Sequence, residues 1–129
     1  MMAIEETSMG EIRIISERID PELLARLVRE TFVTMVKFVV DIDREILAIG
    51  GELHADAEAM LLDAGSDSRN LWGANYHPGV GREECIEYTA MINIRPSRGN
   101  PAMEVRDPEI RERIRAVAFR LIGEGETLG

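Results

Sequence analysis

Residues 52–58, with the sequence ELHADAE, hold the side chains best suited to chemistry, because one histidine lies among three carboxylates. If this segment is extended, Glu52, His54 and Asp56 share one face. If it is helical, Glu52 pairs with Asp56 and His54 pairs with Glu58, each four residues apart. Both geometries bring a carboxylate close to the imidazole. The sequence therefore predicts Glu52, His54 and Asp56 as candidate catalytic residues.

Three interpretations of this segment stay open. A neighbouring carboxylate would fix the tautomer of His54 and raise its basicity, as a general base requires. One histidine nitrogen with several carboxylate oxygens would instead suit Mn²⁺, Mg²⁺ or Zn²⁺. The candidate ligands are His54, Asp56 and Asp41, and Asp43 and Glu45 could add further ligands. The third interpretation needs no ligand, since acids in the first helical turn favour the helix dipole.

A second polar segment, residues 93–100, has the sequence NIRPSRGN and is suited to binding an anion. Arginine binds carboxylate or phosphate through two parallel hydrogen bonds, and a glycine-containing loop can offer backbone amides. Asn93, Arg95, Arg98 and Asn100 are therefore the candidate ligand-binding residues. The alternative is a turn whose arginines only form ion pairs with the acidic part of the chain.

The elements that must position these residues follow from the spacing of apolar residues. Asp-Pro-Glu occurs at residues 20–22 and 107–109, and each copy is a strong helix start. Periodicity predicts helices over residues 21–34, 53–64 and 108–122, and strands over residues 11–16, 35–42, 46–49, 71–76 and 85–95. The last of these strands alternates most cleanly. The order β-α-β-β-α-β-β-α predicts an α+β fold with about five mostly antiparallel strands and helices mainly on one face.

Length and composition restrict the class of protein. A chain of 129 residues suits a single domain, with residues 1–10 and 123–129 expected to be flexible ends. A net charge of -9 argues against a nucleic-acid partner, which would need a basic face. No apolar run is long enough to span a membrane, and no leader is evident. The single cysteine, Cys85, agrees with a reducing cytoplasm.

Several short motifs together resemble a known family. They are ELHAD at residues 52–56, LWG at 71–73, INIRP at 92–96 and GN at 99–100. These motifs resemble a family of small prokaryotic proteins of unknown function, over roughly residues 36–115. The resemblance implies a stand-alone cytosolic protein and transfers no catalytic role.

Two functions from different classes are expected. The first is a small-ligand or metal-dependent site, in which the His54 segment and the Arg95 loop bind a small anionic ligand, with a divalent metal as the conceivable cofactor. The second is a non-catalytic interaction module that forms a homo-oligomer, with Trp72, Tyr76 and Met91 as interface anchors. The residues do not decide whether the protein is an enzyme.

Overall fold

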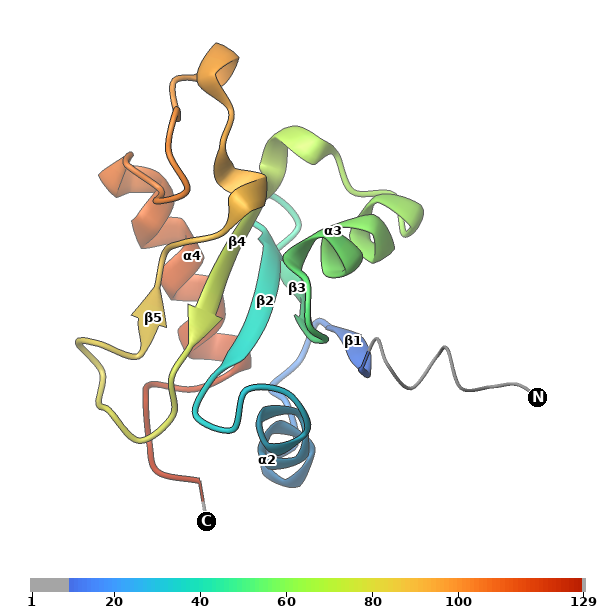
Figure 1. The fold of residues 1–129 in the computed structure, drawn as a ribbon, viewed down its shortest axis with the longest axis vertical. Helices are drawn as coiled ribbons and strands as arrows, with labels where there is room; N and C mark the ends of the chain where they lie inside the picture. The colour runs from blue at the N-terminus through green and yellow to red at the C-terminus, as the bar shows by residue number, and fades with distance from the viewer. Residues whose placement is uncertain (1–9, 129) are drawn as a thin grey trace.

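A five-stranded antiparallel sheet organises the computed structural model, which describes residues 10–128 (Figure 1). The strands lie in the order β1-β3-β2-β4-β5. Their bounds are β1 (Ile12–Ile15), β2 (Val36–Asp41), β3 (Ile46–Gly50), β4 (Leu71–Tyr76) and β5 (Ile86–Glu87), and the helices are α2 (Pro21–Glu30), α3 (His54–Asp63) and α4 (Pro108–Leu121). The predicted α+β class and the predicted order of elements are confirmed.

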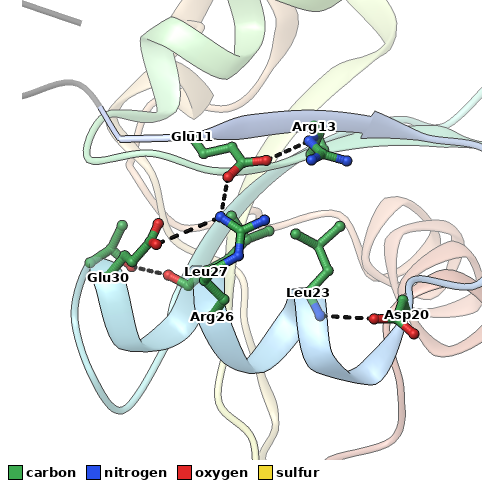
Figure 2. Close-up of polar contacts among 8 residues, drawn as sticks. Glu11, Arg13, Asp20, Leu23, Arg26, Leu27 and Glu30 are labelled. Atoms are coloured by element: carbon green, nitrogen blue, oxygen red, sulfur yellow. Dashed lines mark hydrogen bonds and ion pairs between the residues drawn. The ribbon is translucent and has the colours of Figure 1, made fainter. Parts of the chain in front are cut away.

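Capping chemistry sets where the two Asp-Pro-Glu helices begin. Oδ2 of Asp20 accepts a hydrogen bond of 3.1 Å from the backbone N–H of Leu23 (Figure 2). In α4, Oδ1 of Asp107 accepts one of 2.9 Å from Glu109. Figure 2 also shows Arg26 bridging Glu11 and Glu30, which ties α2 to the residue just before β1. Helix α2 ends at Glu30, earlier than expected.

Alternation along the central strand β2 divides the core into two layers. Phe38 and Val40 pack with residues of α2 and α4 on one face, whereas Val39 packs with Ala57 and Leu61 of α3 on the other. Helices α3 and α4 accordingly lie on opposite sides of the strands in Figure 1. Within the described residues, two of the three α-helices share a face, and α3 alone covers the second face.

The expected strand over residues 85–95 is wrong beyond its first residues. Strand β5 covers only Ile86–Glu87, and the chain then forms an isolated bridge between Thr89 and Glu104 and two 3-10 turns, Met91–Asn93 and Pro96–Arg98. The physical reason lies in Asn93. Its side chain pairs with the backbone of Gly73 in β4, where a neighbouring strand would otherwise pair.

The C-terminal end packs against the body of the protein, although the sequence predicts a flexible end there. The N–H of Gly125 donates a hydrogen bond of 2.8 Å to the buried Tyr76 hydroxyl. The N–H groups of Gly79 and Gly81 each donate one of 3.0 Å to the carbonyl of Gly125. Most of the other expected flexible end, residues 1–9, lies outside the described residues.

Helix α4 packs one face against the sheet and anchors two of its other residues to the β2–β3 turn. Ile114 and Leu121 are buried, whereas Arg113 and Arg120 donate hydrogen bonds to the backbone carbonyls of Ile42 and Glu45 at the β2–β3 turn. No helix within residues 10–128 is long and apolar enough to cross a membrane.

Candidate functional site

His54 is the first residue of α3, and its imidazole is buried, with 8% of the residue exposed. Its Nε2 lies 2.8 Å from the backbone carbonyl oxygen of Ala74 in β4. A carbonyl can only accept a hydrogen bond, so Nε2 carries the proton and Nδ1 is left as an acceptor. Burial lowers the pKa of His54 from its usual value, and the charge of Lys37 lowers it further, against the opposing effects of the Ala74 carbonyl, the Asn75 side chain and the Glu87 carboxylate. The imidazole is therefore neutral at pH 7.

The predicted carboxylate partners do not hydrogen-bond to this imidazole within the described part of the chain. Glu52 precedes the helix and is exposed. Asp56 lies on another side of α3, and its Oδ2 is buried without a hydrogen-bond partner among residues 10–128. Glu58, one turn after His54, pairs with Arg95. The structure thus does not form the expected carboxylate–imidazole pair.

The three candidate metal ligands are not brought together either. Asp41 is fully buried and accepts hydrogen bonds from the backbone N–H groups of Asp43 and Arg44, at 3.0 and 2.9 Å, and from Oγ of Ser66 at 2.6 Å. These contacts cap the β2–β3 turn. Within residues 10–128, no three histidine, cysteine, aspartate or glutamate side chains gather in a way that could hold a metal ion.

A row of polar side chains crosses the sheet beside His54. Lys37, Asn75 and Glu87 are directly opposite one another in the register of β2, β4 and β5. Nδ2 of Asn75 donates a hydrogen bond of 3.0 Å to Oε1 of Glu87, and Nε2 of His77 lies 3.1 Å from the same oxygen. Asn75 and His77 together lower the pKa of Glu87.

Asn75 itself is not satisfied. Its partner Glu87 is a carboxylate that can only accept, so the Asn75 amide must point its Nδ2 toward Glu87. Its Oδ1 is then left over, and this oxygen is buried without a hydrogen-bond partner within residues 10–128. The whole residue is 8% exposed.

His54, Asn75 and Lys37 line a cavity of about 390 Å³. The cavity lies between the sheet, the start of α3 and residues 89–92, and the other lining residues are mostly apolar: Phe32, Met35, Leu53, Ala55, Thr89, Ala90, Met91, Ile92 and Met103. Leu53 and Met91 are strongly exposed, at 56% and 74%. We call this space the His54 cavity.

Gly73 allows the two sides of the His54 cavity to approach each other. A Cβ atom at Gly73 would lie 2.6 Å from Cβ of Ala90 and 3.1 Å from Cδ2 of His54. No side chain larger than hydrogen fits there without displacing one of them. The glycine of the LWG motif thus sets the spacing between β4, α3 and residues 89–92.

The Arg95 loop forms a separate, neighbouring feature. Arg95 lies over the Trp72 ring at 5.1 Å, and its Nη2 is 3.4 Å from Oε2 of Glu58. Arg95 and Arg98 line a second cavity of about 410 Å³, which shares only Ile92 with the His54 cavity. The His54 segment and the Arg95 loop therefore meet at the ion pair between Glu58 and Arg95, and Ile92 lies between the two cavities. His54 itself is not part of this contact.

The two asparagines of this loop hold backbone groups. Nδ2 of Asn100 donates to the carbonyls of Asn93 and Ala102, at 2.8 and 2.9 Å, and its Oδ1 accepts from the N–H of Arg106 at 3.0 Å. Asn93 is equally engaged with Gly73. Both side chains are buried, and their hydrogen bonds fold the loop.

Sequence reasoning missed Lys37, Asn75 and Glu87 as neighbours of His54, and it missed His77 as a partner of Glu87. A signal was present, because Lys37 and Asn75 each interrupt an otherwise apolar strand. A polar residue inside a buried strand needs a partner or a role. The register that aligns these residues with Glu87 was not readable from the pattern.

Comparison with known proteins places the chain in a family. It matches the family described as a protein of unknown function (DUF5674) over residues 13–121. The chain belongs to DUF5674. The DUF5674 match includes every residue that lines the His54 cavity, and it confirms the resemblance inferred from the short motifs. No curated protein and no solved structure matches the chain.

Proposed function

We propose that this protein binds a small, largely apolar molecule in the His54 cavity. The observation that carries the proposal is the buried Oδ1 of Asn75, which lacks a hydrogen-bond partner among the residues that the structure describes. Leaving a buried acceptor unpaired costs roughly 1–3 kcal/mol. A ligand that donates a hydrogen bond to this oxygen would remove that cost.

The lining of the cavity supports the same proposal. Ligand sites are typically apolar spaces of roughly 300–1,000 Å³ with a few well-placed polar groups. The His54 cavity has this character, with Lys37, His54 and Asn75 among mainly apolar side chains. Met35, Met91 and Met103 suit a ligand site because methionine adapts its shape to what it contacts.

A catalytic role for His54 is the finer form of this proposal. With Nε2 held by Ala74, the neutral ring offers Nδ1 as a proton acceptor. Glu52 and Asp56 do not orient the ring, so a reaction here would use His54 without a carboxylate partner. The cytoplasmic location expected from the sequence stays a prediction. Cys85 is buried and forms no disulfide within residues 10–128, as expected in a reducing compartment.

Two alanines on the same helix provide a matched test. Ala55 and Ala59 are both exposed on α3, but only Ala55 lines the cavity. Small metabolites would be screened by thermal shift, and the hits located by ¹H–¹⁵N chemical-shift mapping. We expect hits to perturb Lys37, His54 and Asn75, to be lost in Ala55→Phe and to be retained in Ala59→Phe. Hits that map elsewhere, or that survive Ala55→Phe, would contradict the proposal.

Self-association is a second candidate function, favoured by the exposed apolar side chains around the cavity mouth. Phe32, Leu53, Met91 and Met103 are all exposed there. Large exposed apolar patches mark interaction sites. Of the anchors expected from the sequence, Trp72 and Tyr76 are buried in the core, so only Met91 is available.

Light scattering coupled to gel filtration tests self-association. If the exposed apolar side chains around the cavity mouth join two copies of the chain, Met91→Glu shifts the measured molecular mass toward that of the monomer. Val80→Glu, at an exposed apolar residue elsewhere, leaves the measured mass unchanged. A wild-type protein that is monomeric at high concentration would contradict this second function.

A further inference from the structure

The polar groups at the base of the His54 cavity form a definite pattern of donors and acceptors. Nδ1 of His54 is an acceptor, because Nε2 is committed as a donor to the Ala74 carbonyl. Oδ1 of Asn75 is an acceptor, because Nδ2 is committed to the Glu87 carboxylate. Both assignments are fixed by partners that can only accept.

Lys37 adds a cationic donor to this pattern. It lines the same cavity, and its Nζ lies 5.0 Å from the centre of the Phe32 ring. Lys37 is directly opposite Asn75 in the register of β2 and β4, and its charge contributes to lowering the pKa of His54. The cavity therefore offers two neutral acceptors, Nδ1 of His54 and Oδ1 of Asn75, and one cationic donor, Lys37.

From this pattern we infer, on the basis of the proposed function, that the ligand ends in an uncharged N–H donor group of the primary carboxamide class and not in a carboxylate. The amide NH₂ would donate to Nδ1 of His54 and Oδ1 of Asn75, and the amide carbonyl would accept from Lys37. A carboxylate has no proton to donate, so its oxygens would face two acceptor atoms in a desolvated space.

The negative charge of a carboxylate does not reverse this preference. His54 is neutral, because burial lowers its pKa, and the nearby Glu87 carboxylate adds a like charge. Lys37 is the cation among the lining residues, and it can donate to a carboxylate oxygen as well as to an amide oxygen. The two head groups therefore differ at their second atom, where only the amide has a proton for the two acceptors. The ligand expected from the sequence was anionic, and the donor–acceptor pattern of this cavity favours a neutral one.

Benzamide and benzoate form a matched pair of probes, since they share a ring and differ only in the head group. Their dissociation constants would be measured near pH 7.5 by ¹H–¹⁵N chemical-shift titration of the whole chain. We expect benzamide to bind at least about tenfold more tightly than benzoate. Both probes should perturb residues 89–92 and His54, which line the cavity.

A variant separates the head-group pattern from general apolar binding. Asn75→Leu removes the unpaired acceptor and keeps the size of the side chain, so the preference for benzamide should fall severalfold. Asn70→Leu makes the same change just before β4, outside the lining of the cavity, and should keep the preference.

The outcomes distinguish the inference from the proposed function. Equal binding, or tighter binding of benzoate, with shifts at residues 89–92 would overturn the carboxamide inference and leave the ligand cavity standing. A preference that persists in Asn75→Leu would overturn it as well. No shift at any lining residue with either probe would overturn the inference and count against the cavity as a ligand site.

Discussion

The side-chain amide of Asn93 pairs with both backbone polar groups of Gly73. Its Oδ1 accepts a hydrogen bond of 2.9 Å from the Gly73 N–H, and its Nδ2 donates one of 3.0 Å to the Gly73 carbonyl. The same Nδ2 donates another of 3.0 Å to the carbonyl of Met103. One side chain thus does for β4 what the peptide group of a neighbouring strand would do, and it joins the two ends of the loop over residues 93–103.

This relationship predicts a large stability loss when Asn93 is made apolar. Asn93→Leu leaves backbone groups of Gly73 and Met103 buried without partners, and we expect a loss of about 2–4 kcal/mol in the free energy of unfolding. Urea unfolding followed by circular dichroism measures it. Asn70→Leu serves as the matched control, with a loss below about 1 kcal/mol. Equal losses in both variants would show that the pairing with Gly73 contributes little.

Gly73→Ala tests the close approach in the LWG motif. The new Cβ would lie 2.6 Å from Cβ of Ala90, so β4 and residues 89–92 must separate. We expect a loss of about 1–3 kcal/mol, as in other overpacked cores. The double variant Gly73→Ala/Ala90→Gly should recover part of this loss, because it removes the atom in conflict. Additive losses in the double variant would contradict the steric explanation.

The depressed pKa of His54 predicts that stability falls on mild acidification. Burial lowers the pKa of His54 below 6.5, its value in an unfolded chain, so below about pH 6.5 the unfolded state binds a proton that the folded state resists. The free energy of unfolding is therefore undiminished by His54 above that pH, and it decreases progressively as the pH falls toward the pKa of His54 in the folded state. Urea unfolding at about pH 7.5 and 5.5 measures the difference.

Comparison with a variant assigns that pH dependence to one residue. In His54→Gln the amide can still donate to the Ala74 carbonyl but does not titrate, so the fall in stability between the two pH values should shrink. The C2–H resonance of His54 in the wild type should titrate with a midpoint below 6.5. A midpoint at or above 6.5 would contradict the burial argument.

The fold was largely predictable because its signals are local. The two Asp-Pro-Glu caps fixed the starts of α2 and α4, and the apolar run over residues 71–76 matched β4 in full. The strand expected over residues 85–95 was not predictable to its end. Its alternation is real, but the pairing that would extend it is taken by Asn93, whose partner lies 20 residues earlier in the chain.

The candidate site was only half predictable, for a related reason. His54 was recognised from its own segment. The Ala74 carbonyl that it contacts, and the polar row of Lys37, Asn75 and Glu87 beside it, come from strands that only the register of the sheet brings close. Arg95 was expected to face the acidic segment. It does so through Glu58, because this residue follows His54 by one helical turn and Glu52 precedes the helix.

The ion pair between Glu58 and Arg95 gives the last prediction. The Arg95 side chain is 13% exposed, and its Nη1 is buried without a hydrogen-bond partner within residues 10–128, so Glu58 is the main compensation for its charge. Burial already lowers the pKa of Arg95, and Glu58 opposes that shift.

Removing Glu58 alone should therefore destabilise the protein more than removing both partners. We expect Glu58→Ala to cost about 1–2 kcal/mol, and Glu58→Ala/Arg95→Leu to cost less, because the double variant leaves no buried cation and keeps an apolar contact with Trp72. Chemical unfolding of the three proteins gives the comparison. A double variant less stable than Glu58→Ala would show that Arg95 stabilises the loop through its contact with Trp72 and not through its charge.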